Sequence, residues 1–326
     1  MAKTFLVLGG AGYIGSAVVS SLCDSGNKVL VIDNLQTGKK NFVDPRAEFF
    51  QVDVLDRKNF FDFFRNSNNY FDAIFHFAAN KDARESQQNA SKFSKDITGI
   101  QNVLDAMVKF KIPKIIFSSS AAVYGNPSKF PISESAELKP TNFYGASKKI
   151  CEELIFWYHQ IHHISFIIFR YFNVAGDIGL KFFDTVSSNL FPEIVRVLRG
   201  EKDYLQIFGQ NFKTRDGTAI RDYIHLQDLV QAHILAIDFS VSEIFNLGTK
   251  NGSTVLEILE TFEKIFGKKI PKKFLPRKTG EPEKLIADSF KAQKFLNWQP
   301  KNSLENIVFS VWNYVFSGKL TKKIKR

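Results

Sequence analysis

Three side chains, a tyrosine, a lysine and a serine, have the types and spacing needed to take a proton from a hydroxyl group. Tyr144 and Lys148 lie four residues apart in YGASK, so a helix that begins there would carry both on one face. A free tyrosine has a pKa of about 10 and is a poor base near neutral pH, but a neighbouring ammonium group favours the phenolate. Ser120, in SSSAAVYG, could hydrogen-bond both the reacting hydroxyl and the phenol. Beside a dinucleotide cofactor, these residues would form a site that oxidises a hydroxyl group.

The stretch FLVLGGAGYIGS, residues 5–16, predicts the part of the fold that would hold such a cofactor. Its first four residues are a continuous apolar run, typical of a parallel strand buried on both faces. Gly9, Gly12 and Gly15 then permit a tight turn, close approach of backbone N–H groups to a pyrophosphate, and close packing of the next helix. Gly10, Gly12 and Gly15 fit the GxGxxG spacing equally well, and a glycine turn that binds no ligand is the alternative.

Acidic and small residues at the ends of the next predicted strands indicate which dinucleotide would bind. The second strand, residues 28–32, ends at Asp33, whose carboxylate would hold a ribose diol and repel a 2′-phosphate, so NAD is favoured over NADP. In the third strand, Asp53 could accept a hydrogen bond from adenine or cap the next helix. The fourth strand, residues 71–79, ends in small residues that would let the backbone run against the cofactor, and Lys81 follows closely.

Strands and helices alternate along the first half of the chain. This alternation predicts an α/β fold, a Rossmann-type doubly wound parallel sheet with ligands at the carboxyl ends of its strands. Beyond about residue 176 the alternation loosens, which predicts a smaller α/β substrate domain. We expect residues 1–176 and about 222–250 to form the NAD-binding domain, and about 177–221 and 251–326 to form the domain that binds the substrate.

Composition limits the classes of function. Hydrophobic residues make up 44% and charged residues 24% of the 326 residues, as in ordinary globular proteins. The formal charge of +11 comes from dispersed lysines and arginines, densest at residues 319–326, so we expect no nucleic-acid partner. The histidines and cysteines lack metal-ligand spacing, so we expect no metal. No apolar run reaches the length of a membrane span and no signal sequence precedes the first strand, so we expect no membrane partner and a cytoplasmic location.

Five motifs, GGAGYIGS, SSSAAVYG, YGASK, RYFNVAG and RDYIH, occur in an order typical of one family. Over essentially its whole length the chain resembles the UDP-hexose 4-epimerases of the extended short-chain dehydrogenase family. RYFNVAG and GTAIRDYIH are the most specific motifs, because they belong to the branch that acts on nucleotide sugars. The resemblance implies an NAD-dependent enzyme that inverts C4 of a UDP-hexose, such as UDP-glucose or UDP-galactose, through a transient 4-keto intermediate.

The resemblance also implies roles for individual residues. Tyr144 would be the base, Lys148 its electrostatic partner and a ribose ligand, and Ser120 the residue that orients the hydroxyl. The cofactor positions are Gly9, Gly12, Tyr13, Ile14, Gly15, Asp33, Asn34, Asp53, Val54, Phe77, Ala78, Ala79, Lys81, Asp96, Tyr144, Lys148 and Phe172. The UDP-sugar positions are Lys81, Ser120, Tyr144, Asn173, Asn189, Leu190, Gln206, Phe208, Arg221, Arg277, Lys278, Glu281 and Leu285. Among these, Gln206 and Phe208 would hold uracil and Arg221 would contact the diphosphate.

Structural roles are the alternatives for several substrate positions. An asparagine such as Asn173 often makes a turn after a strand, and Arg221 could form a surface ion pair. Gln206 and Phe208 also fit a half-buried strand.

Other positions depart from the family pattern. Ala122 replaces a frequent hydroxyl residue two positions after the proposed catalytic serine, and Asp96 stands where an asparagine near the cofactor is common. Lys278 replaces the usual arginine, so either Arg277 or Lys278 would meet the second phosphate, and Glu281 occupies the usual aspartate position. These departures leave the assignment of the two basic residues open.

Leu285 bears on the range of substrates. It aligns with the position that, in the family, flanks the C2 substituent of the sugar. Members restricted to UDP-glucose and UDP-galactose resemble one another in carrying a tyrosine there, whereas those that accept N-acetylated sugars carry a smaller residue. We therefore expect UDP-N-acetylglucosamine and UDP-N-acetylgalactosamine to be substrates too. The alternative is that Leu285 packs under its loop and does not approach the sugar.

The same motifs bear on two alternative functions and on the assembly state. A nucleotide-sugar dehydratase or decarboxylase would need a further acid or base beside the serine, where Ala121 and Ala122 supply none, and a catalytically silent NAD-binding sensor would not need all three catalytic residues. The resemblance implies a homodimer formed through the helix over residues 91–111 and the helix after Tyr144. Phe156, Trp157 and Ile161 could lie in that contact or face their own sheet. 

Overall fold

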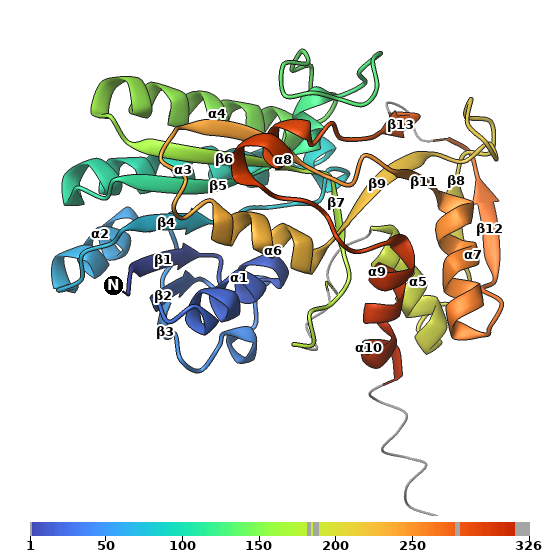
Figure 1. Ribbon diagram of the computed structural model, residues 1–326, viewed down its shortest axis with the longest axis horizontal. Coiled ribbons are helices and arrows are strands. Elements are labelled where there is room, and N and C mark those ends of the chain that lie inside the picture. The colour runs from blue at the N-terminus through green and yellow to red at the C-terminus, as the bar shows by residue number, and fades with distance from the viewer. Residues whose placement is uncertain (1, 181–183, 185–188, 278–280, 317–326) are drawn as a thin grey trace, which may run out of the picture.

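A seven-stranded parallel sheet forms the larger part of the protein (Figure 1). The structure, a computed structural model, describes residues 2–180, 184, 189–277 and 281–316. The strand order is β10-β6-β5-β4-β1-β2-β3, and every pair of neighbours in it is parallel. The strands are β1 (Thr4–Leu8), β2 (Lys28–Asp33), β3 (Glu48–Gln51), β4 (Ala73–His76), β5 (Lys114–Ser120), β6 (Ser165–Tyr171) and β10 (Glu243–Leu247). The order reverses between β1 and β4, so the predicted doubly wound sheet is confirmed, and sheets of this kind bind their ligands where the order reverses.

Both faces of this sheet are buried, because alternate residues of each central strand enter opposite cores. Phe5 and Val7 of β1 belong to the core formed with α1 and α6, whereas Leu6 and Leu8 belong to the core formed with α2, α3 and α4. The helices are α1 (Tyr13–Asp24), α2 (Arg57–Asn66), α3 (Ala90–Phe110), α4 (Phe143–His162) and α6 (Leu226–Leu235). Many of the phenylalanines pack edge-on in the second core, as Phe60 does with Phe64.

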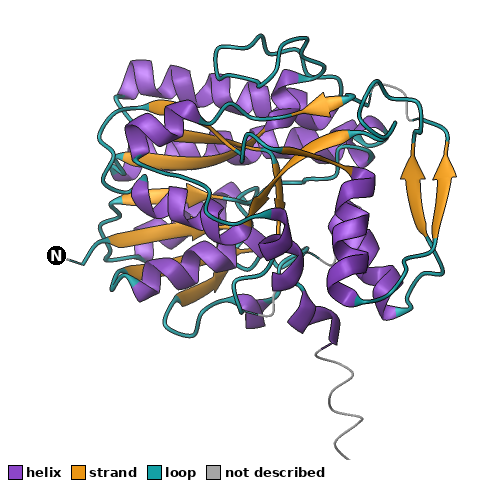
Figure 2. Ribbon diagram, turned by 45° about the vertical axis from the view of Figure 1, so that its right-hand side comes forward, coloured by secondary structure: helices purple, strands orange, loops and turns teal. Residues whose placement is uncertain are grey.

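Two smaller sheets and a second helical cluster form the rest of the described structure. One sheet has the order β11-β9-β13 with β7 also paired to β9, and the other pairs β8 with β12 at the outer edge of the molecule (Figure 2). These strands are β7 (Asn173–Ala175), β8 (Leu205–Phe208), β9 (Ile220–His225), β11 (Gly252–Thr254), β12 (Lys272–Leu275) and β13 (Lys284–Leu285). The helices are α5 (Leu190–Arg199), α7 (Val255–Phe266), α8 (Phe290–Leu296), α9 (Leu304–Ser310) and α10 (Trp312–Phe316). All but α8 contribute to a separate apolar core.

Short 3-10 helices connect some of these elements: η1 (Lys40–Phe42), η2 (Glu85–Gln87) and η3 (Ala121–Tyr124). Strand β10 and helix α6 return to the large sheet late in the chain. The residue boundaries of the two domains stay a prediction.

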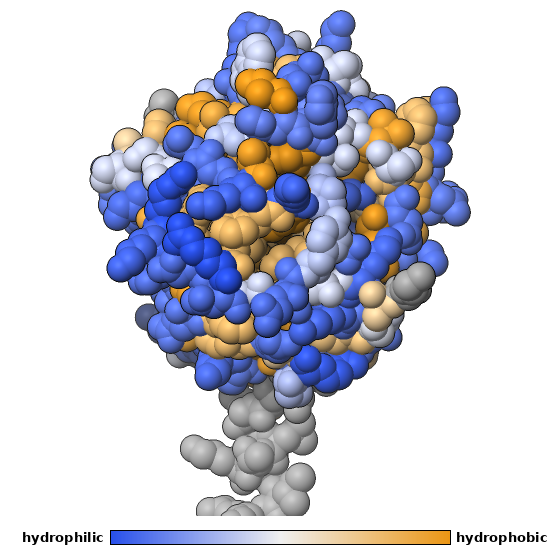
Figure 3. All heavy atoms as spheres, turned by 90° about the vertical axis from the view of Figure 1, so that its left-hand side faces the viewer, coloured by the Kyte–Doolittle hydropathy of each residue, from blue (hydrophilic) through white to orange (hydrophobic). Residues whose placement is uncertain are grey.

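The surface and the helices bear on membrane and partner contacts. None of the helices within the described residues is long and apolar enough to cross a membrane. On the face shown in Figure 3, hydrophobic groups form separate patches among hydrophilic ones, and a hollow opens near the middle of the face. In the part of the chain that the structure describes, no group of three or more His, Cys, Asp or Glu side chains is arranged to hold a metal ion.

Candidate active site

The glycine turn after β1 brings three segments of backbone unusually close together. Gly9 has φ +78°, and a Cβ atom there would lie 2.5 Å from the backbone N of Ala78 in the segment after β4. A Cβ atom on Gly15 would lie 2.2 Å from the carbonyl oxygen of Gly9, so α1 could not pack this closely with any other residue. Gly12 caps α1 without a side-chain hydrogen bond, which leaves the first N–H groups of the helix open to an anion. These features fit the pyrophosphate of a dinucleotide.

Asp33 ends β2 beside this turn. Its side chain is only 8% exposed, and its carboxylate accepts hydrogen bonds from the backbone N of Ala11 (3.0 Å) and of Leu35 (2.8 Å). The Asn34 amide donates to Asp53 (3.0 Å), so these two predicted cofactor residues contact each other. Asp53 also accepts from the backbone N of Leu55 in a turn, while Asp56 is the N-cap of α2. The helix-capping alternative for Asp53 is therefore not what the structure contains, and its contact with adenine stays a prediction.

The predicted catalytic residues come from the end of β5 and the start of α4. Asn142 caps α4 through a 2.8 Å hydrogen bond from the backbone N of Gly145. A Cβ atom on Gly145 would lie 2.4 Å from the carbonyl oxygen of Ala122, so this glycine lets α4 approach η3 closely. The Nζ of Lys148, a residue that is 4% exposed, donates to the carbonyl oxygen of Ser118 (2.8 Å).

Lys148 is thus tied to the strand that carries Ser120. Ser120 is the last residue of β5, and its hydroxyl accepts a hydrogen bond from the backbone N of Ala122 (3.2 Å). Tyr144 lies one helical turn before Lys148 and is half-buried. The structure therefore brings all three residues to the carboxyl end of the large sheet, while their catalytic roles stay predictions.

A buried polar network that the sequence did not reveal lies behind Ser120. Glu152 on α4 accepts hydrogen bonds from the hydroxyl of Ser119 and from the guanidinium of Arg170 on β6, at 3.0 Å from Nε and 2.6 Å from Nη2. Arg170 also donates to the hydroxyl of Tyr124 (2.9 Å), which donates to Asn246 on β10 (2.7 Å). The arginine of RYFN was the only sequence signal, because its charge interrupts an otherwise apolar strand.

The loop after β4 carries several predicted cofactor residues, and the sequence did not reveal the contacts that this loop makes. Ala78 approaches Gly9, and Lys81 forms an ion pair with Asp184 (2.7 Å). Asn80 is held by Asp96 of α3. Of the remaining cofactor positions, Tyr13 and Ile14 begin α1, Val54 follows β3, Phe77 and Ala79 flank Ala78, and Phe172 is buried between β6 and β7.

The predicted substrate residues lie on the smaller sheets and the segments between them. Glu281 accepts a hydrogen bond from the guanidinium of Arg221 (3.2 Å), and its backbone oxygen accepts one from Arg277 (3.0 Å). Burial lowers the pKa of Arg221, and Glu281 opposes that shift. Because the side chain of Arg221 is only 14% exposed, its ion pair is not a surface pair. Glu281 thus brings Arg221 and Arg277 together, whereas Lys278 lies outside the described residues.

Other predicted substrate positions spread along three elements. Asn173 begins β7, Asn189 precedes α5 as its N-cap, and Leu190 is the first residue of that helix. Gln206 is exposed on β8 and Phe208 ends that strand, and the guanidinium carbon of Arg84 lies 5.9 Å from the ring of Phe208. Leu285 pairs in register with Arg221 and packs against the cluster that contains Ala121 and Phe172.

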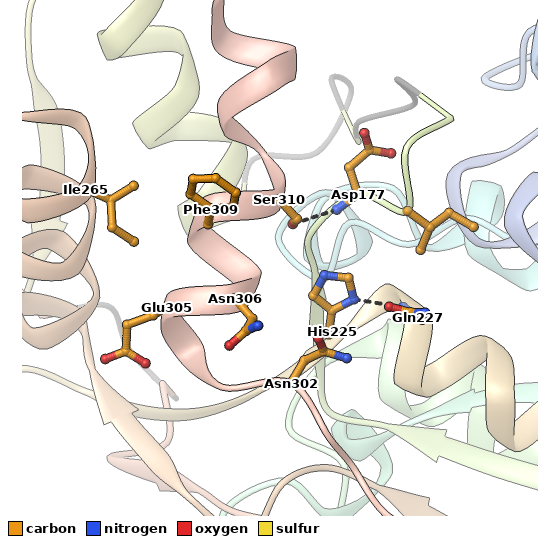
Figure 4. Close-up of a pocket in the computed structure, with 10 residues that line it drawn as sticks. Asp177, His225, Gln227, Ile265, Asn302, Glu305, Asn306, Phe309 and Ser310 are labelled. Atoms are coloured by element: carbon orange, nitrogen blue, oxygen red, sulfur yellow. Dashed lines mark hydrogen bonds between the residues drawn. The ribbon is translucent and has the colours of Figure 1, made fainter.

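One cavity of the described structure is separate from these residues. It has a volume of about 580 Å³ and lies around α9 and the end of β9 (Figure 4). Its lining includes Asp177, His225 and Ser310, and the hydroxyl of Ser310 accepts a hydrogen bond from the backbone N of Asp177 (2.9 Å). None of the predicted site residues lines it, so this cavity has no part in the proposed chemistry.

Comparison with known proteins identifies the class to which this fold and site belong. Residues 5–248 match the model of the NAD dependent epimerase/dehydratase family, and the chain belongs to that family. Within it, the chain is 41% identical over 320 residues to the UDP-glucose 4-epimerase of Lacticaseibacillus casei, covering 95% of this chain and 96% of that one. It is 38% identical over 335 residues to UDP-glucose 4-epimerase 2 of Arabidopsis thaliana, covering 96% and 95% of the two chains.

Solved structures give the same result. The UDP-glucose-4-epimerase of Stenotrophomonas maltophila, with bound NAD and formylated UDP-arabinopyranose, superposes with a TM-score of 0.92 at 32% identity, covering 98% of this chain and 99% of that one. The UDP-Glc/GlcNAc 4-epimerase of Campylobacter jejuni superposes with a TM-score of 0.86 at 34% identity, covering 97% and 100% of the two chains. The predicted family and fold class are therefore confirmed.

Proposed function

We propose that this protein is an NAD-dependent isomerase that inverts C4 of a UDP-hexose, with UDP-glucose and UDP-galactose as its substrate pair. The observation that carries the proposal is the hydrogen bond from Lys148 to the backbone of β5, two residues before Ser120, because it joins the Tyr144 helix to the serine strand. The glycine turn and Asp33 lie at the ends of neighbouring strands. The UDP-glucose 4-epimerases that this chain resembles along nearly their whole length support the same function.

In the proposed mechanism, the chain supplies a base, a charge and an orienting hydroxyl. Tyr144 takes the proton of the 4-hydroxyl group and later returns it to the oxygen at C4. Lys148 favours the phenolate form of Tyr144. Ser120 aligns the oxygen that reacts. NAD, held by the glycine turn and Asp33, would supply a hydride acceptor that is regenerated within each cycle.

The substrate residues would hold the UDP-sugar at its charged and planar parts. Arg221 and Arg277, which Glu281 places side by side, suit the paired oxygens of a diphosphate. Gln206 and Phe208 on β8 are assigned to uracil, and Asn173, Asn189 and Leu190 to the sugar and its phosphates. In this arrangement the smaller domain, about residues 177–221 and 251–326, covers the sugar nucleotide.

Two alternative functions on the same fold would need different residues. A dehydratase or decarboxylase needs an additional acid or base near the serine, and Ala121 and Ala122 occupy the two positions after it. A silent NAD-binding sensor would have no need for Ser120, Tyr144 and Lys148 together. Epimerisation is therefore the function that this set of residues supports best.

The test is to incubate the purified protein with UDP-galactose and, separately, with UDP-N-acetylgalactosamine, and to separate the products by chromatography. Tyr144→Phe should lower kcat by about 10²-fold or more while UDP binding, measured by calorimetry, is retained. Tyr158→Phe is a matched control, because it removes a hydroxyl group on the same helix, one that donates to Asp105. Near-normal turnover of Tyr144→Phe would remove Tyr144 from the mechanism, whereas a stoichiometric requirement for NADH would indicate a net reductase and contradict the proposed function.

The substrate range includes N-acetylated hexoses in this proposal. Leu285, which is assigned to the C2 substituent of the sugar, lacks a phenol ring, and it pairs in register with Arg221, the residue assigned to the diphosphate. The relative from Campylobacter jejuni is named a UDP-Glc/GlcNAc 4-epimerase, which supports a range of substrates in this family that includes N-acetylated sugars.

The assembly in this proposal is a homodimer formed through α3 and α4. Phe156, Trp157 and Ile161 on α4 are 49%, 60% and 64% exposed, which is unusual for large apolar side chains so close together. A second copy of the chain would cover them in a four-helix arrangement. Cys23 and Cys151 are free and buried, as expected in the reducing cytoplasm where we place the protein.

A further inference from the structure

One face of α3 lies against the proposed catalytic residues of α4. Phe93 and Asp96 are three residues apart and therefore share a side of the helix. The ring of Phe93 meets the ring of Tyr144 edge-on, with 6.4 Å between their centroids. The Sγ of Cys151, three residues after Lys148, lies 3.9 Å from the carbonyl oxygen of Asp96. Asp96 thus packs where the Tyr144 and Lys148 turn of α4 meets α3.

The carboxylate of Asp96 is fully engaged by one residue. The backbone N of Asn80 donates to both of its oxygens, at 3.2 and 3.1 Å, and the Asn80 amide donates to Oδ1 at 2.8 Å. The same amide also donates to the carbonyl oxygen of Lys92 (3.1 Å). All three contacts of the carboxylate are with donors, which suits the ionised, acceptor-only form.

The surroundings of Asp96 act on its carboxylate in opposite directions. Burial raises the pKa of Asp96, and the ammonium groups of Lys148 on α4 and Lys92 on α3 oppose that rise. Two further titratable neighbours are neutral near pH 7: burial raises the pKa of Cys151 on α4 to about 12 and lowers that of His76 on β4 to about 3. The electrostatic partner of the Asp96 carboxylate on α4 is therefore Lys148.

We propose that Asp96 is a positioning residue for the catalytic pair, which fixes the loop after β4 through Asn80 and offsets part of the charge that Lys148 presents to Tyr144. This inference rests on the proposed role of Tyr144 as the base. An asparagine at this position could accept some of the same hydrogen bonds but would carry no charge. Removing the negative charge should therefore let the Tyr144 phenolate form at a lower pH.

The experiment is a pH titration of the phenolate by ultraviolet absorbance in the NAD-loaded, full-length protein. The spectrum of the matching Tyr144→Phe protein is subtracted at each pH, so that the difference reports Tyr144. Asp96→Asn should move the midpoint to lower pH by roughly 0.5 to 1 unit, and the acidic limb of the kcat/KM profile should move with it. Asp96→Glu, which keeps the charge, should leave the midpoint near that of the wild type.

Two further variants separate charge from packing. Asp105→Asn removes a carboxylate from the same helix that pairs with Arg57 and Tyr158, and it should not move the midpoint. Asn80→Ala keeps the carboxylate and the backbone N–H that donates to it but removes the amide donor, so it should weaken NAD retention without lowering the midpoint. If Asp96→Asn does not fold, Asp96→Ser removes the same charge and replaces it in the test.

The outcomes are distinct from those of the function test, because the absorbance titration needs no turnover. An unchanged or higher midpoint in Asp96→Asn, or an equal shift in Asp105→Asn, would overturn the inference. A lower midpoint in a protein that converts no UDP-sugar would support the role of Asp96 and contradict the proposed function instead.

Discussion

The ion pair between Glu152 and Arg170 should be one of the most costly contacts to break in this protein. Their side chains are only 5% and 3% exposed, so neither charge can be rehydrated without moving the surrounding core. Glu152→Ala would leave the hydroxyl of Ser119 and two donor atoms of Arg170 without their acceptor. Breaking a buried pair by removing one partner costs about 3–5 kcal/mol, and we expect a loss of that size in the free energy of unfolding.

The loss of unfolding free energy in Glu152→Ala comes mainly from the Arg170 charge that remains buried. A double variant separates this cost from the lost attraction between the two charges. In Glu152→Met with Arg170→Met, both charges are replaced by flexible apolar side chains of similar length, so the double variant should be more stable than Glu152→Ala. Glu153→Ala is the matched control on the next position of α4. Its carboxylate is 59% exposed and lies 3.9 Å from Lys149, a surface pair worth about 0–1 kcal/mol.

The assay is urea unfolding followed by tryptophan fluorescence, with NAD held at one excess concentration because a ligand of the folded state raises the apparent stability. Turnover should be measured on the same samples, since Ser119 precedes the proposed catalytic serine. The reasoning fails if Glu152→Ala costs no more than Glu153→Ala, or if the double variant is no more stable than Glu152→Ala.

Three other predictions use separate parts of the molecule. Burial, and then the charge of Lys148, lowers the pKa of His76 from 6.5 to about 3, so between these pH values the unfolded chain takes up a proton that the folded chain excludes. The free energy of unfolding should therefore fall as the pH drops from 6.5 towards 3, by up to about 1.4 kcal/mol per pH unit. His76→Phe should flatten the pH dependence of the urea midpoint. Leu285→Tyr should suppress conversion of the N-acetylated pair more than that of UDP-glucose and UDP-galactose, measured as kcat/KM, and equal losses for both pairs would remove Leu285 from substrate selection. Trp157→Glu with Ile161→Lys should give monomers by light scattering at micromolar concentration, whereas a wild-type monomer would end the dimer proposal.

The local patterns of the sequence were enough to place the parts of the site that depend on neighbours in the chain. The glycine turn after β1 and the Tyr144 helix could be predicted, because a strand, a turn and a helix start are each encoded within a few residues. The ends of elements were less certain where distant groups decide them. Helix α6 stops at Leu235, where Lys114 of β5 donates to the carbonyl oxygens of Ala236 (2.5 Å) and Phe239 (2.7 Å).

The contacts that hold the predicted site residues in place could not be predicted for the same reason. Asn80 and Asp96 are 16 residues apart, and Glu152 and Arg170 are 18 apart. No periodicity connects such pairs, because each partner is chosen by how β4, α3, α4 and β6 pack. Sequence patterns indicate which side chain does the chemistry, while the packed structure determines what holds it.

The position of β10 has a consequence for the order in which the protein can fold during its synthesis. This strand pairs with β6 at the edge of the large sheet, and the chain between residues 172 and 242 builds β7, β8, β9 and α5 before β10 is reached. On a ribosome, β6 would therefore leave the exit tunnel with its outer backbone edge unpaired while these intervening elements are translated. A nascent chain stalled before residue 243 should resist protease less well than one stalled after β10 has emerged, because only the longer chain can complete the sheet.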